Sequence, residues 1–440
     1  MSWGGGLVLT VADLTNPHFI WLVAIHSSLG RGPPALLTAQ SVGSGCTTES
    51  AQRIMARVRV RGHGLPSAPT YLSAEATRRE EQPSPKGRQY SMRTPLSTRN
   101  ESIDLLRFIG IAMIILAHVS PPEALFQIRN FDVPLMVVVA GLSFRLSFRG
   151  EDYGQYLLKR VKRLVLPVWL FLTASFLLDF LVGHPGAVPS LQTVLLNYSL
   201  LDGAGYVWII RVFLMVAMLA PFILSYSKSE PSHARFFALV AGIYLAYELT
   251  FLFYSPPKRF DQSQVLTSTV NSTLLYLIPY AAIFALGLRI PDLNKRQIAI
   301  LAASAGMVFV AWVFFYENTS GTFIYTQGFK YPPRSYYLSY ALLVTTLLWL
   351  AAPRITAFLS NQQPRAMAVI LFIGQNSIWV YLWHEPFIQN ISLPYLTKYL
   401  VVFSLAVLVT YLQVTLVSRY LLAKIHRQKT KTNLRLILTG

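Results

Sequence analysis

Two ionisable side chains, Arg107 and His118, lie within one apolar stretch of the sequence, residues 103–119. The stretch is long enough to cross most of a bilayer, where an ionisable group costs a few kcal/mol even on lenient scales. Eleven positions at about 100° each leave both side chains on one helical face, about 16 Å apart along the axis. We therefore expect a functional pair. The alternative is that Arg107 snorkels to a lipid headgroup and His118 caps the helix at the interface.

Three further charged residues follow within the next two stretches. Asp132 opens the second apolar stretch, close in sequence to His118. It is predicted either to cap that helix or to orient a catalytic group. Arg160 and Arg163 lie three positions apart on one side of an expected amphipathic helix, and two guanidinium groups at that spacing can grip phosphates. Their alternative role is to anchor the helix to anionic lipid.

Two later stretches combine polar and aromatic residues. The loop FKYPPRSYYLSY contains Tyr331 and Arg334, and aromatic faces with polar groups commonly hold sugars. An interfacial aromatic belt explains the same residues. In NSIWVYLWHEPF, His384 and Glu385 are neighbours within an apolar run. Adjacent helical residues point about 100° apart, so at most one of them faces a given cavity squarely.

The composition is that of a polytopic membrane protein. Of 440 residues, 53% are hydrophobic and only 13% are charged, with a mean hydropathy of +0.44, whereas soluble proteins have about 25% charged residues. The formal net charge of +19 indicates membrane topology and not nucleic-acid binding, because the basic residues fall in short loops between apolar spans. The lone Cys46 excludes an internal disulfide and a cysteine-based metal cluster. No metal site is predicted.

Residues 1–99 differ in composition from the rest of the chain, being rich in Gly, Ser, Ala, Arg and Pro. We expect a poorly structured N-terminal segment. One interpretation is a disordered cytoplasmic tail. The favoured one is that translation begins at Met92, because a short basic lead straight into the first span is typical of bacterial inner-membrane proteins.

The fold class predicted from residue 100 onwards is all-α, a membrane domain over 100–425 with about ten transmembrane helices and no soluble domain. Residues 426–440 are expected to form a basic cytoplasmic tail. Both termini are placed in the cytoplasm, in a plasma (inner) membrane, because Lys and Arg concentrate in the even-numbered loops. The spans are expected at 103–120, 131–148, 164–183, 206–226, 236–254, 273–290, 298–316, 335–352, 368–388 and 396–422. The expected outer loops hold only six basic residues, which are Arg129, Lys258, Arg259, Lys330, Arg334 and Lys398.

The sequence resembles acyltransferase family 3, integral-membrane O-acyltransferases of bacterial surface polysaccharides, over about residues 101–425. The most specific feature is Arg107 followed by ten residues and His118. Also similar are FDVPLMVVVAGLSF, the Arg160-x-x-Arg163 pair, the ten-span layout and SIWVYLWHEPF. The chain departs from common members in WHEP, where many have an apolar residue after the histidine. It also lacks the C-terminal hydrolase-like domain of some members.

The resemblance implies an O-acyltransferase, with acetylation as the expected reaction. Cytoplasmic acetyl-CoA or another acyl-CoA is the donor substrate, and no cofactor is permanently bound. The acceptor is a hydroxyl of a surface polysaccharide or lipid-linked sugar at the outer face. The expected catalytic residues are His118, Arg107, Asp132 and Glu385. Arg160 and Arg163 are expected to bind coenzyme A, and the residues expected to bind the acceptor are Tyr331, Arg334 and His384.

The residues leave three alternatives open. His118 can act as a general base on the acceptor hydroxyl, or it can carry the acetyl group covalently. A transporter or flippase of polysaccharide intermediates would also place charges in the membrane, although no convincing internal repeat is found. A structural subunit of a polymerising complex is the third hypothesis.

Overall fold

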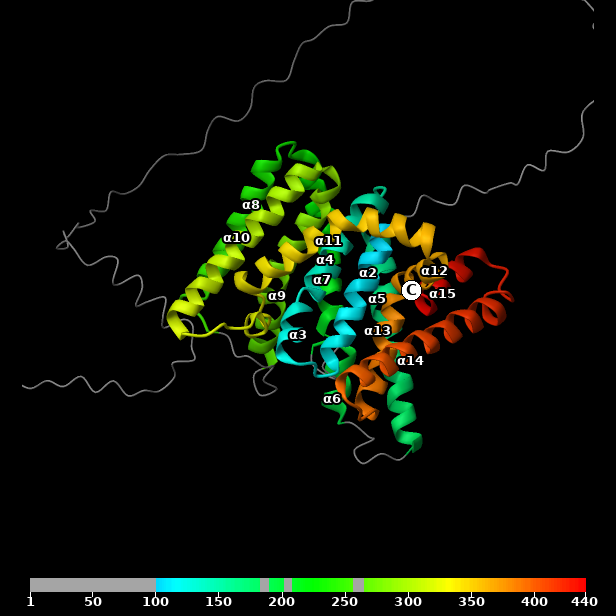
Figure 1. Cartoon of the computed structure of the whole chain (residues 1–440). Coiled ribbons are helices and arrows are strands. Elements are labelled where there is room, and N and C mark those ends of the chain that lie inside the picture. Colours follow the sequence, from blue (N-terminus) through cyan, green and yellow to red (C-terminus); the bar gives the residue numbers. More distant parts are fainter. Residues whose placement is uncertain (1–99, 183–189, 202–207, 256–264) are drawn as a thin grey trace, which may run out of the picture. The chain divides into compact units, whose positions relative to one another are not determined.

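In the computed structural model, the chain is described for residues 100–182, 190–201, 208–255 and 265–440. The predicted N-terminal segment 1–99 lies outside the described residues. The main helices, named as in Figure 1, are α2 (Glu101–His118), α3 (Glu123–Ile128), α4 (Asp132–Ser147), α5 (Tyr153–Val182), α6 (Leu191–Tyr198), α7 (Trp208–Ser229), α8 (His233–Thr250), α9 (Val265–Arg289), α10 (Lys295–Ser320), α11 (Ser335–Gln362), α12 (Pro364–Gln375), α13 (Ser377–Asn390), α14 (Tyr395–Leu416) and α15 (Gln428–Leu438). Three short helices complete them, the 3-10 helices η2 (Ile290–Asp292) and η3 (Thr326–Phe329) and the π-helix η4 (Val417–Leu421).

The predicted all-α membrane fold is confirmed. Over the described ranges, seven helical spans are long and apolar enough to cross a membrane, or eight if the bent pair α12 and α13 is one span. The predicted number of ten is not confirmed. The first predicted span is α2, which has 18 residues and falls outside the seven because it contains Glu101, Asp104 and Arg107.

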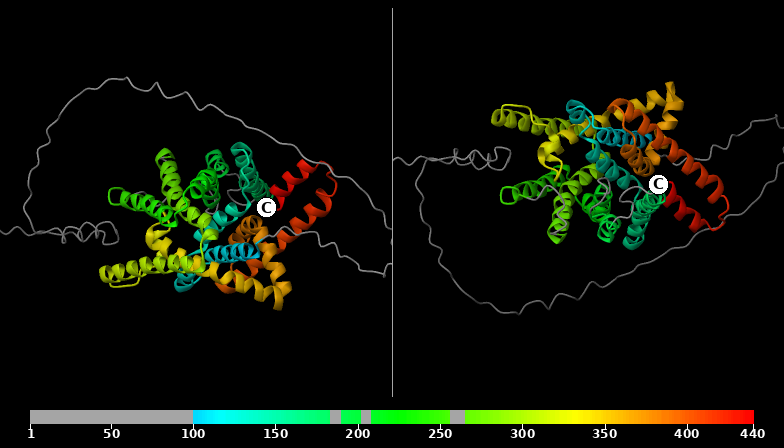
Figure 2. Two further views of the ribbon diagram at one scale, coloured as in Figure 1. Left: turned by 90° about the horizontal axis from the view of Figure 1, so that it is seen from above. Right: turned by 90° about the horizontal axis from the view of Figure 1, so that it is seen from below.

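Helix α4 lies at the centre of the described bundle. In its span 72% of the most apolar stretch is buried, against 17% in the spans of α10 and α14, whose apolar side chains are left for lipid. Figures 1 and 2 show α8 and α10 on one side of α4, and α14 with α15 on the other. Gly141 of α4 and Gly287 of α9 let the two backbones touch, because a Cβ on either would collide with the other helix.

Helix α2 is fixed near its start by a side-chain cap and by a close contact with α12. The Asn100 side chain accepts a hydrogen bond from the Ser102 backbone N–H at 3.1 Å and caps the helix. In α12, Gly374 packs on the backbone of Asp104, where any Cβ would clash. This contact fixes α12 against the first turns of α2.

The chain bends by 85° between α12 and α13. At the bend, the Asn376 side-chain amide donates to the Phe372 carbonyl at 2.7 Å, and the Asn376 backbone N–H donates to the same carbonyl at 3.1 Å. The turn directs α13 along α2. The last helix, α15, then packs on α5, and its Ile437 carbonyl accepts from the Trp379 indole of α13 at 3.2 Å. The predicted basic tail therefore contains a docked helix.

Candidate active site

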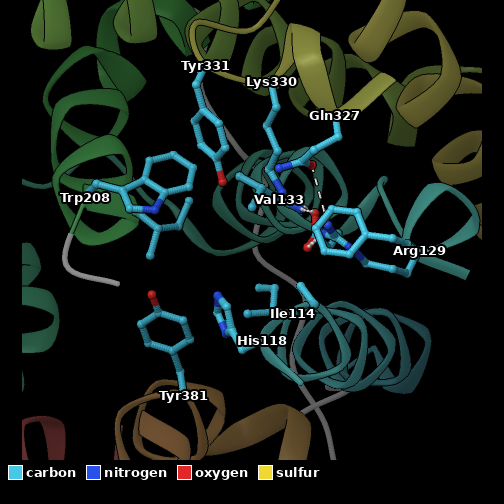
Figure 3. Close-up of a pocket in the computed structure, with 13 residues that line it drawn as sticks. Ile114, His118, Arg129, Val133, Trp208, Gln327, Lys330, Tyr331 and Tyr381 are labelled. Atoms are coloured by element: carbon cyan, nitrogen blue, oxygen red, sulfur yellow. Dashed lines mark hydrogen bonds and ion pairs between the residues drawn. The ribbon is translucent and has the colours of Figure 1, made fainter. Parts of the chain in front are cut away.

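A cavity of about 190 Å³ opens between the end of α2, the start of α4, the η3 loop and α13. His118, the last residue of α2, lines it from one side. Figure 3 shows the hydroxyls of Tyr331 and Tyr381 and the Trp208 ring facing the same open space as His118. Four segments that are distant in sequence therefore bring chemistry-bearing side chains to one point.

His118 is bonded to a second histidine from α13. Its Nδ1 lies 2.9 Å from Nε2 of His384, and the two rings are stacked with centroids 5.1 Å apart. His384 is fully buried, and its own Nδ1 contacts the backbone carbonyl of Tyr381. A carbonyl only accepts hydrogen bonds, so His384 Nδ1 carries the proton and its Nε2 is the acceptor in the neutral ring.

The same logic fixes the tautomer of His118. Because His384 Nε2 accepts, the Nδ1 of His118 must donate, which leaves a lone pair on His118 Nε2. A neutral imidazole with its lone pair at a cavity is a proton acceptor or a nucleophile. The catalytic role of His118 stays a prediction, and the side chain that bonds its Nδ1 is His384.

Asp132 forms a buried ion cluster with two cations. Its Oδ2 accepts from Arg129 Nη1 at 2.7 Å, and its Oδ1 accepts from Lys330 Nζ at 3.1 Å. Oδ1 also accepts from the Val133 backbone N–H at 2.8 Å, as expected for an acidic residue in the first turn of α4. Asp132 lines the cavity beside His118, but its carboxylate is already shared between two cations.

Of the predicted acceptor residues, Tyr331 reaches the cavity and Arg334 does not line it. The Tyr331 ring packs edge-on against Trp208, with centroids 5.4 Å apart. Arg334 instead donates to the Glu248 carboxylate at 2.7 Å and lies over the Phe251 ring at 4.0 Å. Arg334 therefore holds the loop that carries Tyr331. His384, the third residue predicted to bind the acceptor, contacts His118.

Arg107 lies near the start of α2, whereas the cavity lies at the end of this helix. Its guanidinium donates to Asp104 at 2.8 Å and to the Ser143 hydroxyl of α4 at 2.7 Å. The eleven residues that separate it from His118 correspond to about 16 Å along the helix. The side chain remains 21% exposed, so it is reachable from outside the bundle.

Arg160, the first residue of the predicted phosphate-binding pair on α5, approaches the same turn of α4. The Arg160 guanidinium lies 5.6 Å from the Phe144 ring centroid and 5.0 Å from that of Tyr156. Arg107 and Arg160 thus contact successive residues of α4, Ser143 and Phe144. Arg163 follows one turn later on the same helix. Cationic side chains from α2 and α5 are therefore brought to one end of α4.

Glu385 does not line the cavity. It is 9% exposed, and its carboxylate accepts from the Gln389 amide one turn later on α13. Sequence reasoning singled it out because it adjoins His384. The helix directs the two neighbours differently, and His384 is the one that lies within hydrogen-bond distance of His118 through its Nε2.

Sequence reasoning missed Arg129, Lys330, Trp208 and Tyr381 as cavity residues. A signal for two of them was present. Arg129 and Lys330 are basic residues in loops assigned to the outer side, where the positive-inside rule disfavours them. A cation that opposes the topology rule has a local reason to be there, which for both residues is the Asp132 carboxylate.

Residues 100–421 match the family described as an acyltransferase domain. The match begins at the N-cap of α2 and ends in η4, so it includes every helix that contributes to the cavity. A comparison with curated proteins gave no match.

Proposed function

The chain belongs to acyltransferase family 3, and from this premise we propose that it moves an acetyl group from cytoplasmic acetyl-CoA to a sugar hydroxyl. The acceptor is a surface polysaccharide or a lipid-linked sugar at the outer face of the inner membrane. Both ends of the membrane domain then lie in the cytoplasm, in accord with the distribution of basic residues.

The observation that carries the proposal is the hydrogen bond between His118 and His384 at the cavity. It favours the tautomer of His118 that has its lone pair on Nε2, and His118 lines a small space together with aromatic rings and cations. Buried imidazoles that are oriented by a second group are the usual general bases of acyl transfer. A transport path would not need a histidine that is held in one tautomer by a second histidine.

In the proposed reaction, the acceptor hydroxyl donates its hydrogen bond to His118 Nε2. Its oxygen attacks the thioester carbonyl, and the proton passes to Nε2 as the new C–O bond forms. The Nδ1–H of the resulting imidazolium remains bonded to His384, which stabilises the charge. Collapse of the tetrahedral intermediate breaks the C–S bond, and the thiolate of coenzyme A takes the proton from Nε2. A covalent acetyl-imidazole on the same nitrogen is the alternative route.

The donor is proposed to lie with its phosphates at Arg107, Arg160 and Arg163. Arginine binds phosphate bidentately, and the first two side chains contact the neighbouring α4 residues Ser143 and Phe144. The extended pantetheine arm is comparable in length to the separation of about 16 Å between Arg107 and His118 along α2. Phosphates held at one end therefore leave the thioester at the cavity.

The acceptor is proposed to approach the cavity along Trp208, Tyr331 and Tyr381. The three rings line one side of the space that His118 faces, and the tyrosine hydroxyls are directed into it. Aromatic faces with a polar tip suit a sugar ring, which has both apolar and hydroxyl-bearing sides.

The test is to supply membranes containing the protein with acetyl-CoA labelled in the acetyl group. Transfer of label to a polysaccharide or lipid-linked fraction, absent from membranes without the protein, supports the proposal. Release of the label by mild alkali identifies an ester. Translocation of a sugar intermediate without consumption of acetyl-CoA would establish the transporter alternative instead.

A further inference from the structure

The ion cluster beside His118 contains two cations and one anion. The side chains of Arg129, Asp132 and Lys330 are 1%, 2% and 4% exposed, and all three residues line the cavity. With all three side chains ionised, the cluster carries a net charge of +1. Buried charge is costly unless it is paired, so the excess positive charge indicates that an anion occupies this wall at some stage of the reaction.

The two cations have more N–H donors than Asp132 accepts. An ammonium has three donors, and Lys330 makes one hydrogen bond with Asp132. The Nε of Arg129 is buried without a hydrogen-bond partner among the described residues, although its guanidinium lies 3.6 Å from the Phe126 ring centroid. Asp132 therefore positions both cations without using all of their donors.

We propose that the Lys330 ammonium, supported by Arg129, binds the oxyanion of the tetrahedral intermediate. The proposal rests on the proposed function, and it assigns the third component of acyl transfer after the base and the donor site. As the acceptor oxygen attacks, the carbonyl π electrons move onto the thioester oxygen. That negative charge is stabilised at the cluster until the carbonyl re-forms and the thiolate leaves.

The size of the cavity favours an oxyanion over an anionic group of the acceptor. Pockets that enclose a whole small-molecule ligand have volumes of about 300–1000 Å³, whereas this cavity has about 190 Å³. It has room for the reacting carbonyl and hydroxyl, with most of the sugar outside. A carboxylate on the acceptor is the competing anion, and the experiment below separates the two.

The first test measures the kinetics of Lys330→Met and Lys330→Arg, with Lys295→Met as the control. Lys295 is an exposed lysine at the start of α10, and it does not line the cavity. Lys330→Met is expected to lower kcat about 10²- to 10³-fold, the usual effect of removing one oxyanion donor, with the KM for acetyl-CoA unchanged. Lys330→Arg is expected to retain part of the activity, and Lys295→Met all of it.

A second acyl donor, chloroacetyl-CoA, tests whether the negative charge that Lys330 stabilises is on the thioester oxygen. Chloroacetyl-CoA has an electron-withdrawing acyl group that stabilises the oxyanion by itself. The defect of Lys330→Met is therefore expected to be smaller with chloroacetyl-CoA than with acetyl-CoA. An equal defect with both donors, together with a raised KM for the acceptor, would overturn the proposal in favour of an acceptor carboxylate.

An activity-independent measurement uses Trp208, which lines the same cavity. The fluorescence that is lost in Trp208→Phe reports on this tryptophan. Its quenching by iodide, an anion, is expected to weaken in Lys330→Met, whereas quenching by neutral acrylamide is unchanged. Equal iodide quenching in wild type and Lys330→Met would overturn the inference of an anion site, even if no acetyl transfer were found.

The outcomes for the two proposals are distinct. Wild-type protein that transfers acetyl groups while Lys330→Met keeps its kcat contradicts only the oxyanion assignment. Wild-type protein without transfer contradicts the proposed function, while the iodide measurement still decides whether the cluster attracts anions. A Lys330→Met protein that elutes as an aggregate is replaced by Lys330→Gln, for which the same loss of kcat and of iodide quenching is expected.

Discussion

His118 and His384 are 266 positions apart in the chain, and their ring nitrogens are 2.9 Å apart in the fold. The contact joins the end of α2 to the middle of α13. Because His384 is anchored in turn on the Tyr381 carbonyl, the protonation pattern of both rings is determined by the backbone of α13. The Tyr381 carbonyl therefore decides which nitrogen of His118 carries the lone pair.

The first prediction concerns His384 as the group that positions His118. His384→Phe removes the acceptor of the His118 Nδ1–H and lets the ring turn, and kcat is expected to fall about 10²-fold, as misplacement of a reacting group often causes. His384→Gln retains a side-chain oxygen that can accept the same hydrogen bond and should recover part of the loss. Steady-state kinetics of both variants with acetyl-CoA check this. Equal losses in Phe and Gln would indicate that His384 only fills space.

The second prediction concerns donor binding. Replacing Arg160 and Arg163 together by Gln removes the guanidinium groups that are proposed to hold the phosphates, so the KM for acetyl-CoA is expected to rise. Gln at Lys424 and Lys429 provides a control with the same loss of charge near the end of the chain. An unchanged KM in the Arg160/Arg163 variant would return the pair to the role of lipid anchors.

The third prediction concerns the transfer rate at alkaline pH. Burial lowers the pKa of the Lys330 ammonium below its ordinary value, and the neighbouring Asp132 carboxylate partly opposes the shift. Arg129, which shares the Asp132 carboxylate with Lys330, also lowers the pKa of Lys330 because the two positive charges repel each other. A lowered pKa means that the positive charge is present at low pH and is lost as pH rises, earlier than for an exposed lysine.

We therefore expect the transfer rate to fall at alkaline pH, below the ordinary lysine pKa of about 10.4. Burial raises the pKa of the nearby Tyr331 hydroxyl, so ionisation of this residue does not produce the same loss. Lys330→Arg keeps its charge and should move the alkaline loss to higher pH. A pH–rate profile that is identical for lysine and arginine would exclude Lys330 as the titrating group.

The fourth prediction concerns the loop that carries Lys330 and Tyr331. Glu248 accepts from Arg334 and from the tyrosine hydroxyl of Tyr244, at 2.7 and 2.8 Å. Glu248→Ala leaves both donors without this partner and is expected to lower stability by about 1–3 kcal/mol. It should also raise the KM for the acceptor while the KM for acetyl-CoA is unchanged. Thermal unfolding and two-substrate kinetics check the two effects, and a selective change in the donor KM would contradict the assignment.

The fold class could be predicted from the sequence because it depends on local properties. Apolar runs of bilayer length are visible residue by residue, and an observed helix overlaps each expected span. The bounds differ most where α5 begins at Tyr153 and α11 ends at Gln362, and the ninth expected span is divided into α12 and α13. The number of membrane spans was harder to predict, because it depends on how many charged residues a spanning helix can contain. Helix α2 packs beside α4, but its three charged residues separate it from purely apolar spans.

The candidate site could be predicted only in part, because its contacts join distant segments. Arg107 and His118 share one helix, so their spacing alone indicated a common face. The pairing of His118 with His384 depends on the bend at Asn376, which no local pattern located. Adjacent in sequence, His384 and Glu385 were equally plausible cavity residues. Only the packing of α13 on α2 separates them.

The most direct measurement of the central claim is acetyl transfer by His118→Ala, compared with His426→Ala, a histidine at an exposed position. Both variants are assayed in membranes at saturating acetyl-CoA, with binding of coenzyme A measured in parallel. If His118 Nε2 is the base or the nucleophile, His118→Ala lowers transfer by about 10²- to 10⁴-fold and still binds coenzyme A, whereas His426→Ala is unchanged. Retention of more than about a tenth of the wild-type transfer rate by His118→Ala, well short of that loss, would contradict the account.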